Sequence, residues 1–498
     1  MIFSQKYLLR MLVPAVVAGA VTGCSVGPNF HRPDPPVTSV YSLARQPAET
    51  VTAGGPGGSA QHFNAGMDIP ASWWSLFRCE PLDRMVRLAL AGSPTLAQAR
   101  ARLIQAREDL NARTGATRYP AVDAGLSAVR QQVDTAAFGV ANVPSLGPFT
   151  LYNASVSVSY ALDLFGGNRR ALEGLGAKVD YQQFELEAAR QTLAANVVIA
   201  AIMQASLHAQ IAAVQDLLSA QKRQLDITQQ RYQAGGVSLL DVQNQSLLLD
   251  QTRVLLPPME KQLMQVNHQL STYLGQEPAQ VEIASISLNT LHLPEELPLS
   301  LPSSLARQRP DIRAAEALLH QASANIGVAT ANLYPQIKLS GSLGTERTSL
   351  ADILSGYNVW SLGANLAQPL FRGGELMAQK RSAVAAYDEA LAGYKETVLQ
   401  GLQEVADTLY ALDADARTLK TRADATGHAQ AGYAMAEQQY QLGGISQLVL
   451  LDAQRQLLQS DIEKVRAQAD RYTDTAALLH ALGGGWWQAE KGKSAGGN

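Results

Sequence analysis

The chain has 498 residues, of which 46% are hydrophobic and 17% charged, and its formal net charge is −3. This composition excludes a disordered or collagen-like chain, and the even mixture of 40 basic and 43 acidic residues argues against nucleic acid as a partner. Only two cysteines occur, Cys24 and Cys79, so neither a disulfide framework nor a four-cysteine zinc site is available.

Residues 1–23 have the features of a cleavable secretion signal. Lys6 and Arg10 form a positive start, and Met11 to Ala20 is an apolar run too short to span a bilayer permanently. The following Val21-Thr22-Gly23-Cys24 resembles the bacterial lipoprotein signal, which implies S-diacylglycerol and N-palmitoyl groups on Cys24. In that resemblance Ser25 favours sorting to the outer membrane. An ordinary signal peptide with a chance cysteine is the alternative.

Two halves of the chain repeat one another. Arg231 to Ser238 matches Gln439 to Ser446 at an offset of 208 residues, and Leu164 to Gly167 recurs as Leu370 to Gly374. The repeat predicts a duplicated unit. In each unit a helix is followed by two segments of alternating hydrophobicity, a very long helical stretch, a Gly-Gly turn and a second helical stretch.

The alternating segments predict membrane-spanning strands. From Val156 to Leu164 large apolar residues alternate with small or polar ones, and the pattern recurs at Ile337–Leu343, at Trp360–Leu366 and more weakly at Val122–Val129. About ten residues suffice for a tilted strand to cross a bilayer, and small polar residues on the second face are typical of a water-filled barrel. A soluble sandwich has the same period and stays an alternative.

Two helical stretches are unusually long. Asn168–Tyr232 and Glu375–Tyr440 contain no proline, so each predicts a helix of about 65 residues and roughly 100 Å. Such lengths indicate a coiled coil or helical array with antiparallel partners.

Glycine pairs end these helices. Gly235-Gly236 and Gly443-Gly444 supply the turns, because glycine takes the left-handed conformation at a helix end. The return helices are expected at Ser238–Tyr273, with a break at Pro257-Pro258, and at Ser446–Leu482.

Four strands cannot close a barrel, since the smallest outer-membrane barrels have eight and an open edge in lipid leaves backbone groups unpaired. The chain is therefore expected to oligomerise. Three copies would give twelve strands, although composition does not fix three over two or four.

Several motifs in order resemble the outer-membrane efflux lipoproteins of the TolC/OprM (NodT) type. They are Trp73-Trp74 to Phe77, Leu255 to Pro258, Arg309 to Glu316, Ala324 to Ala329 leading to Tyr334-Pro335, Gln368 to Gly374 and Leu451 to Arg455. The resemblance implies an α+β membrane protein, a homotrimer with a twelve-stranded β-barrel continued by a periplasmic helical barrel. It also implies a bacterial outer-membrane location, a periplasmic adaptor and an inner-membrane transporter of the resistance-nodulation-division type.

The resulting organisation has ten segments. These are a signal peptide (1–23), a lipidated extended tether (24–66), an equatorial segment with the first helix (67–117), strands (118–165), a helical hairpin (166–274), an equatorial linker (275–310), a helix (311–333), strands (334–371), a second hairpin (372–482) and a flexible tail (483–498).

The resemblance also assigns functional positions at the helical tips. Leu448 and Asp452 match the inward-facing residues that close the periplasmic end, and their four-residue spacing puts them on one helix face. Without the resemblance, Asp452 is more simply a solvated surface acid. The positions matched to adaptor docking are Tyr232, Gly235, Gly236, Ser238, Tyr440, Gly443, Gly444 and Ser446, for which helix capping is the alternative role.

Neither a catalytic site nor a metal site is expected. The eight histidines are scattered, and no phosphate-binding loop, GxGxxG or GxSxG motif occurs. Apart from the lipid on Cys24, no cofactor is predicted. Together with the family resemblance, the sequence predicts a passive duct for small molecules rather than an enzyme, with a protein-secretion duct and a lipid-anchored coiled-coil scaffold as alternatives.

Overall fold

The computed structural model describes residues 25–43, 47–132, 147–280 and 283–488. It divides into two compact units, which are described separately below. Unit 1 comprises Met1–Arg32, Arg102–Gln182 and Ala315–Tyr394, and unit 2 comprises Pro33–Ala101, Gln183–Ala314 and Lys395–Asn498. Long helices and a small sheet make the architecture mixed, as predicted.

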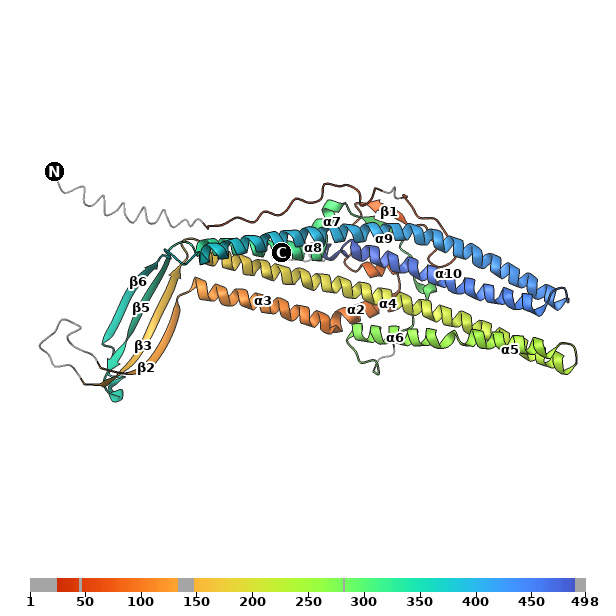
Figure 1. The fold of residues 1–498 in the computed structure, drawn as a ribbon, viewed down its shortest axis with the longest axis horizontal. Helices are drawn as coiled ribbons and strands as arrows, with labels where there is room; N and C mark the ends of the chain where they lie inside the picture. The colour runs from red at the N-terminus through yellow and green to blue at the C-terminus, as the bar shows by residue number, and fades with distance from the viewer. Residues whose placement is uncertain (1–24, 44–46, 133–146, 281–282, 489–498) are drawn as a thin grey trace. The chain divides into compact units, whose positions relative to one another are not determined.

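Unit 1 contains an antiparallel sheet of four strands in the order β2-β3-β5-β6 (Figure 1). The strands are β2 (Ala121–Gln131), β3 (Phe149–Leu162), β5 (Gln336–Arg347) and β6 (Val359–Ala367). The predicted alternating segments are thus confirmed as strands. Val158 lies opposite Val122 on β2 and Gly341 on β5, so one face of the sheet continues from strand to strand.

The two long helices are also confirmed. α4 (Gly167–Gln233) and α9 (Glu375–Gln441) each have 67 residues. Both end in the same way. Gly235 and Gly443 have φ of 75° and 73°, and the next glycine in each turn donates its N–H to the carbonyl five residues earlier at 2.8 Å. This is the left-handed helix ending that glycine allows.

The return helices differ between the halves. After α4 the chain forms α5 (Leu239–Arg253) and α6 (Leu256–Leu274), whereas after α9 a single helix, α10, runs from Gln447 to Ala481. Pro257 and Pro258 lie in the first turn of α6, where backbone N–H groups have no helical partner to lose. The predicted break is confirmed.

The core of unit 2 is built from aromatic and aliphatic residues of distant segments. Trp73 and Phe77, in the short 3-10 helix η1 (Trp73–Phe77), are fully buried and pack with Leu270 of α6 and Tyr472 of α10.

The remaining elements of the two units are β1 (His62–Ala65), α2 (Glu80–Gly92), α3 (Pro94–Arg118), η3 (Leu288–Thr290), β4 (Glu296–Leu299), α7 (Pro302–Gln308), α8 (Pro310–Ala331) and η4 (Leu350–Asp352).

A buried arginine ties the end of α10 to this core. Arg309, 5% exposed, lies between α7 and α8 and donates to Asp311 at 2.6 and 3.0 Å. It also donates to Glu404 of α9 at 2.7 Å and to the carbonyl of Ala481 at 2.8 Å. Two carboxylates and a carbonyl therefore satisfy a cation that would be costly to bury alone.

Two expectations about the chain ends need correction. Residues 24–66 were expected to form an extended tether, but β1 pairs with β4, and Arg471 donates to Thr50 and to the carbonyl of Ser59. The flexible tail expected from residue 483 is wrong for residues 483–488. There Trp486 is 6% exposed and donates to the carbonyl of Gln308 at 2.7 Å, because burial of its ring outweighs the glycine-rich composition.

Candidate channel wall and helical tips

The sheet of unit 1 has one apolar and one hydroxyl-rich face. Val122, Val158 and Leu362 share the apolar face and are 65%, 41% and 84% exposed. The opposite face carries Ser342 and Ser361, whose hydroxyls are 2.8 Å apart. An apolar face this exposed is unfavourable in water, and the same alternation suits a wall between lipid and a water-filled lumen.

The sheet is also open at both sides. Within the described residues β2 and β6 each pair with only one neighbour, so each presents an edge. An edge inside a bilayer leaves N–H and C=O groups without hydrogen bonds, which costs several kcal/mol per group. The sheet of one chain is thus an incomplete membrane wall.

The tips lie in unit 2, where α4 turns into α5 and α9 turns into α10 (Figure 1). The predicted docking residues fall at these turns. All four glycines, Gly235, Gly236, Gly443 and Gly444, are exposed, as are Tyr232, Ser238 and Ser446, while Tyr440 is half-buried. Ser238 caps α5: its side chain accepts from the N–H of Asp241, and Asp241 accepts in return from the N–H of Ser238. Ser446 makes no such side-chain cap.

The predicted gate residues lie one turn apart on α10. Leu448 is 70% exposed, although leucine is usually buried. Asp452 accepts from Arg455 at 2.6 Å and from Gln456 at 2.7 Å. The hydrogen bond from Arg455 holds the pKa of the Asp452 carboxyl below its usual value, so the group is ionised throughout the physiological range. The negative charge is paired within its own helix, a feature that sequence reasoning missed.

A buried amide contact joins the two hairpins near the tips. Gln447 of α10, 8% exposed, donates to Gln245 of α5 at 3.1 Å, and Gln245 donates weakly to the carbonyl of Gln221 at 3.4 Å. Gln221 is fully buried and both of its amide atoms lack a partner. Sequence reasoning missed this cluster. Glutamine at an apolar position of each helical stripe was the available signal.

Comparison with known proteins agrees with this geometry. The profile described as outer membrane efflux protein matches residues 85–276 and 301–484. The chain belongs to the outer membrane efflux protein family. Among curated relatives, the pyoverdine export outer membrane protein OpmQ of Pseudomonas putida is 30% identical over 83% of this chain and 88% of its own length. Outer membrane protein OprJ of Pseudomonas aeruginosa is 28% identical, over 95% of each chain.

Solved structures of efflux family channels have the same fold. The outer-membrane channel OprN superposes with a TM-score of 0.81 and 28% identity, covering 93% of this chain and all of that one. The outer membrane protein VceC of Vibrio cholerae superposes with a TM-score of 0.75 and 27% identity, covering 84% of this chain and all of that one. The chain is thus an outer-membrane efflux channel component, and the soluble sandwich considered for its strands is excluded.

The remaining sites are the two cysteines and the side chains that could bind a metal ion. Cys24 lies outside the described residues, so its lipid stays a prediction. Cys79 is a free thiol and is 6% exposed, within the core of unit 2. Among the described residues, no group of three or more His, Cys, Asp or Glu side chains is arranged to hold a metal ion.

Proposed function

We propose that three copies of this chain form a passive duct that exports small molecules across the outer membrane. The observation that carries the proposal is the sheet with an exposed apolar face and two open edges. Three copies would supply twelve strands, enough to close a wall and satisfy every edge. Transport energy would come from an inner-membrane resistance-nodulation-division transporter, coupled through a periplasmic adaptor at the glycine tips.

The proposed gate is the ring that three copies of Leu448 and Asp452 would form. Exposed leucines meeting at an axis would make a dry constriction, and carboxylates beside it would favour cations. Since Asp452 is paired with Arg455, the ring would present compensated rather than bare charges. We therefore expect weaker cation selectivity than three free carboxylates would give.

The amide contact supports a gate that moves as a hairpin. Gln447 precedes Leu448, so displacement of Leu448 would strain or break the hydrogen bond to Gln245. A buried amide left without a partner costs about 1–3 kcal/mol, which would favour the closed arrangement.

Lipid on Cys24 is proposed to add a second attachment to the membrane, since multiple acyl chains anchor stably.

Planar-bilayer recording of the purified full-length protein tests this function. We expect single-channel steps, with rare openings for the natural chain and frequent openings for a Leu448→Ala, Asp452→Ala double variant. The matched control is Leu240→Ala with Asn244→Ala, the corresponding positions of the first hairpin, where Leu240 is 67% exposed. Equally frequent openings in the two double variants would contradict the gate, and a lack of steps in all samples would contradict the duct.

A further inference from the structure

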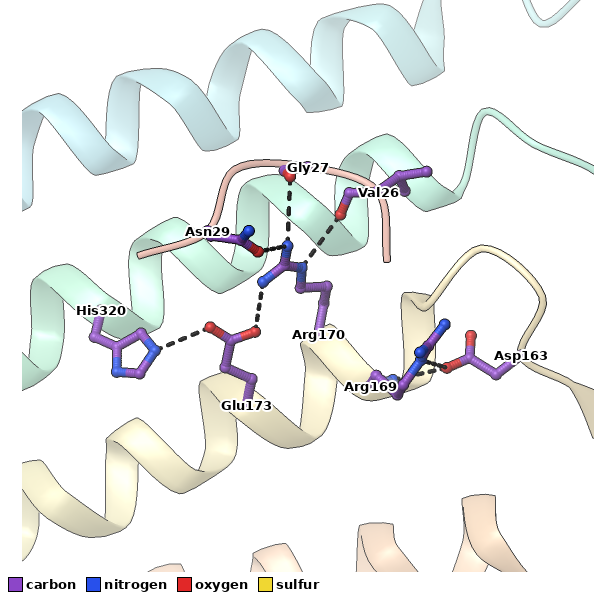
Figure 2. Close-up of polar contacts among 8 residues, drawn as sticks. All are labelled: Val26, Gly27, Asn29, Asp163, Arg169, Arg170, Glu173 and His320. Atoms are coloured by element: carbon purple, nitrogen blue, oxygen red, sulfur yellow. Dashed lines mark hydrogen bonds and ion pairs between the residues drawn. The ribbon is translucent and has the colours of Figure 1, made fainter. Parts of the chain in front are cut away.

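The first residues of the described chain are held in a socket within unit 1. Figure 2 shows the segment carrying Val26, Gly27 and Asn29 lying across α8, with Arg170 of α4 reaching into it. We call residues 25–32 the strap. It has no regular secondary structure, yet it makes specific polar contacts at several points along its length.

Arg170 is the centre of these contacts. Its side chain is buried, 4% exposed, and donates to the carbonyl of Val26 at 3.2 Å, to the carbonyl of Gly27 at 3.4 Å and to Oδ1 of Asn29 at 2.8 Å. Its remaining nitrogen donates to Glu173 at 2.7 Å. A guanidinium with several donors in a fixed plane suits this multiple contact, which a lysine could not reproduce.

The carboxylate beside Arg170 is fixed as well. Glu173 accepts from Arg170 and lies 2.9 Å from His320 of α8 (Figure 2). Burial opposes ionisation of Glu173, but the hydrogen bonds from Arg170 and His320 outweigh it and hold the Glu173 pKa below its usual value. The charge of Arg170 is therefore balanced without help from the strap.

Three glycines make room for the strap. A Cβ on Gly27 would lie 2.4 Å from the Cα of Gly327, and one on Gly327 would lie 2.6 Å from Arg170. A Cβ on Gly166 would lie 2.6 Å from the hydroxyl of Ser25, and Gly166 has φ of 77°. Close approach of backbones requires glycine at such positions. The socket is thus built into both α4 and α8 as well as into the strap.

The other end of the strap is fixed by a ring and an ion pair. Phe30 stacks on His320 with ring centroids 4.4 Å apart. Arg32 pairs with Glu316 at 2.6 Å. At the beginning, the N–H of Val26 donates to the carbonyl of Phe165 at 3.0 Å, just after β3 ends. The strap therefore connects the end of a strand to α8.

Within the described part of the second half of the chain, the corresponding turn has no such socket. At the corresponding turn before α9, Gly373 and Gly374 have φ of 56° and 85°, and a Cβ on either would meet nothing within 4 Å. The first turn of α9 carries Leu376, Met377 and Ala378 where α4 carries Arg170. The strap is thus a feature of one repeat, and strand-to-helix turns of this kind do not need it to form.

We propose that the strap docks the N-terminal lipid anchor to the junction of β3 and α4, and that this docking is needed for the sheet to insert and the trimer to assemble. The proposal rests on the proposed lipidation of Cys24 and on the proposed trimer. Cys24 directly precedes Ser25 in the sequence, so a lipid there is tethered through one peptide bond to a residue that lies against Gly166. Arg170 acts as a positioning residue for the anchor.

The experiment uses the full-length chain in a Gram-negative host, with three readouts. An alkynyl palmitate label reports acylation, and the yield of SDS-resistant trimer in outer membranes reports assembly. Phe30 replaced by p-benzoylphenylalanine reports docking, because light would join it to the α8 peptide that carries His320. The variants are Gly27→Leu in the strap and Arg170→Ala in the socket, with Arg170→Lys as the conservative change.

The matched control is Gly176→Ala on the same helix as Arg170, where an added Cβ meets nothing within 4 Å. For Gly27→Leu and Arg170→Ala we expect the label to stay, the cross-link to vanish and trimer yield to fall on the order of tenfold, the factor for losing a set of charged hydrogen bonds. Arg170→Lys should give an intermediate loss, and Gly176→Ala none.

Each other outcome is decisive. A lost cross-link with unchanged trimer yield overturns the role in assembly, and a natural chain that gives no cross-link overturns the docking. A natural chain without label but with cross-link and trimer overturns the lipidation of Cys24, and with it the claim that the strap docks a lipid anchor. An SDS-resistant species of another stoichiometry overturns the trimer and leaves the strap intact.

Discussion

The two helical hairpins, whose tips lie in unit 2, are built on the same plan but held together differently. Hairpin 1 consists of α4, α5 and α6, and hairpin 2 consists of α9 and α10. Their outgoing helices both have 67 residues, and their tips turn on glycines of nearly equal φ. Hairpin 1 returns in two pieces and has a capped tip, whereas hairpin 2 returns in one helix of 35 residues without a side-chain cap.

The polar contacts between their arms differ in charge. In hairpin 1, Gln204 donates to Asn267 at 2.8 Å, which is a neutral pair. In hairpin 2, Arg422 pairs with Glu463, and Asp415 of α9 shares a hydrogen bond with Asp474 of α10. Besides neutral contacts such as that from Thr426 to the carbonyl of Ser460, the hairpin with the proposed gate thus has contacts between its arms that respond to pH and salt. Two hairpins with helices of equal length and with the same glycine turns can therefore differ in how their stability depends on pH and salt.

Breaking the continuous return arm should have the largest effect. Val465 lies at the position of α10 that corresponds to Pro257, and Val465→Pro would remove a helical hydrogen bond at a cost of about 3 kcal/mol or more. We expect a clear drop in the thermal unfolding temperature followed by circular dichroism. Val465→Ala controls for the lost side chain, and Pro257→Ala should have a much smaller effect. Equal losses for the two proline-related variants would refute the distinction between the return arms.

The glycine turns should respond equally in both hairpins. Gly235→Ala and Gly443→Ala each place a Cβ at positive φ, which costs roughly 1–2 kcal/mol. Chemical denaturation should give the same loss for the two variants within error. Gly427→Ala, in the body of α9 with open space around it, is the control and should stabilise slightly. A loss at only one turn would show that the tips are held by more than backbone conformation.

The caps should respond unequally. Ser238→Ala removes a capping box and should cost about 1 kcal/mol, while Ser446→Ala removes no side-chain cap and should cost close to nothing. The rate of amide hydrogen exchange in the first turn of α5 measures the effect of Ser238→Ala, and the rate in the first turn of α10 measures the effect of Ser446→Ala. Faster exchange in the first turn of α10 after Ser446→Ala would contradict the assigned difference.

Replacing Asp415, which shares a hydrogen bond with Asp474, should have the smallest effect on stability at neutral pH. It should instead change how stability depends on pH. Burial, followed by the hydrogen bond with Asp474 and the charge of Asp470, raises the pKa of Asp415 to about 7, although Arg471 opposes the shift. Between the usual value near 3.8 and about 7, the folded protein binds more protons than the unfolded one, so stability falls as pH rises. Solvent screening moderates the energy because the carboxyl is partly exposed.

Asp415→Asn should therefore reduce the loss of thermal stability between about pH 5 and about pH 8. Asp413→Asn is the control, because Asp413 pairs with Arg417 on the same helix at 3.0 Å. An unchanged pH dependence in Asp415→Asn would mean that another group controls it, and would remove one contrast between the hairpins.

The sequence by itself determined the local elements of this protein. Alternation of period two placed the four strands, and the lack of proline over about 65 residues placed the long helices, because both signals depend on near neighbours. The glycine turns and the break at Pro257 follow from backbone sterics alone. The motifs were long enough to indicate the family, and they also pointed to the tip residues.

Only the tertiary structure decided which distant segments meet. Arg170 and Gly27 are 143 residues apart and Gln447 and Gln245 are 202 apart, so no local pattern marks them as partners. Trp486 was expected to lie in a flexible tail, and the strap in an extended tether. A composition rich in glycine and proline indicates how the backbone behaves locally, but it does not show which distant residues a segment contacts. Such contacts exist because folding brings buried donors to acceptors far along the chain, and a buried hydrogen-bonding group without a partner lowers stability.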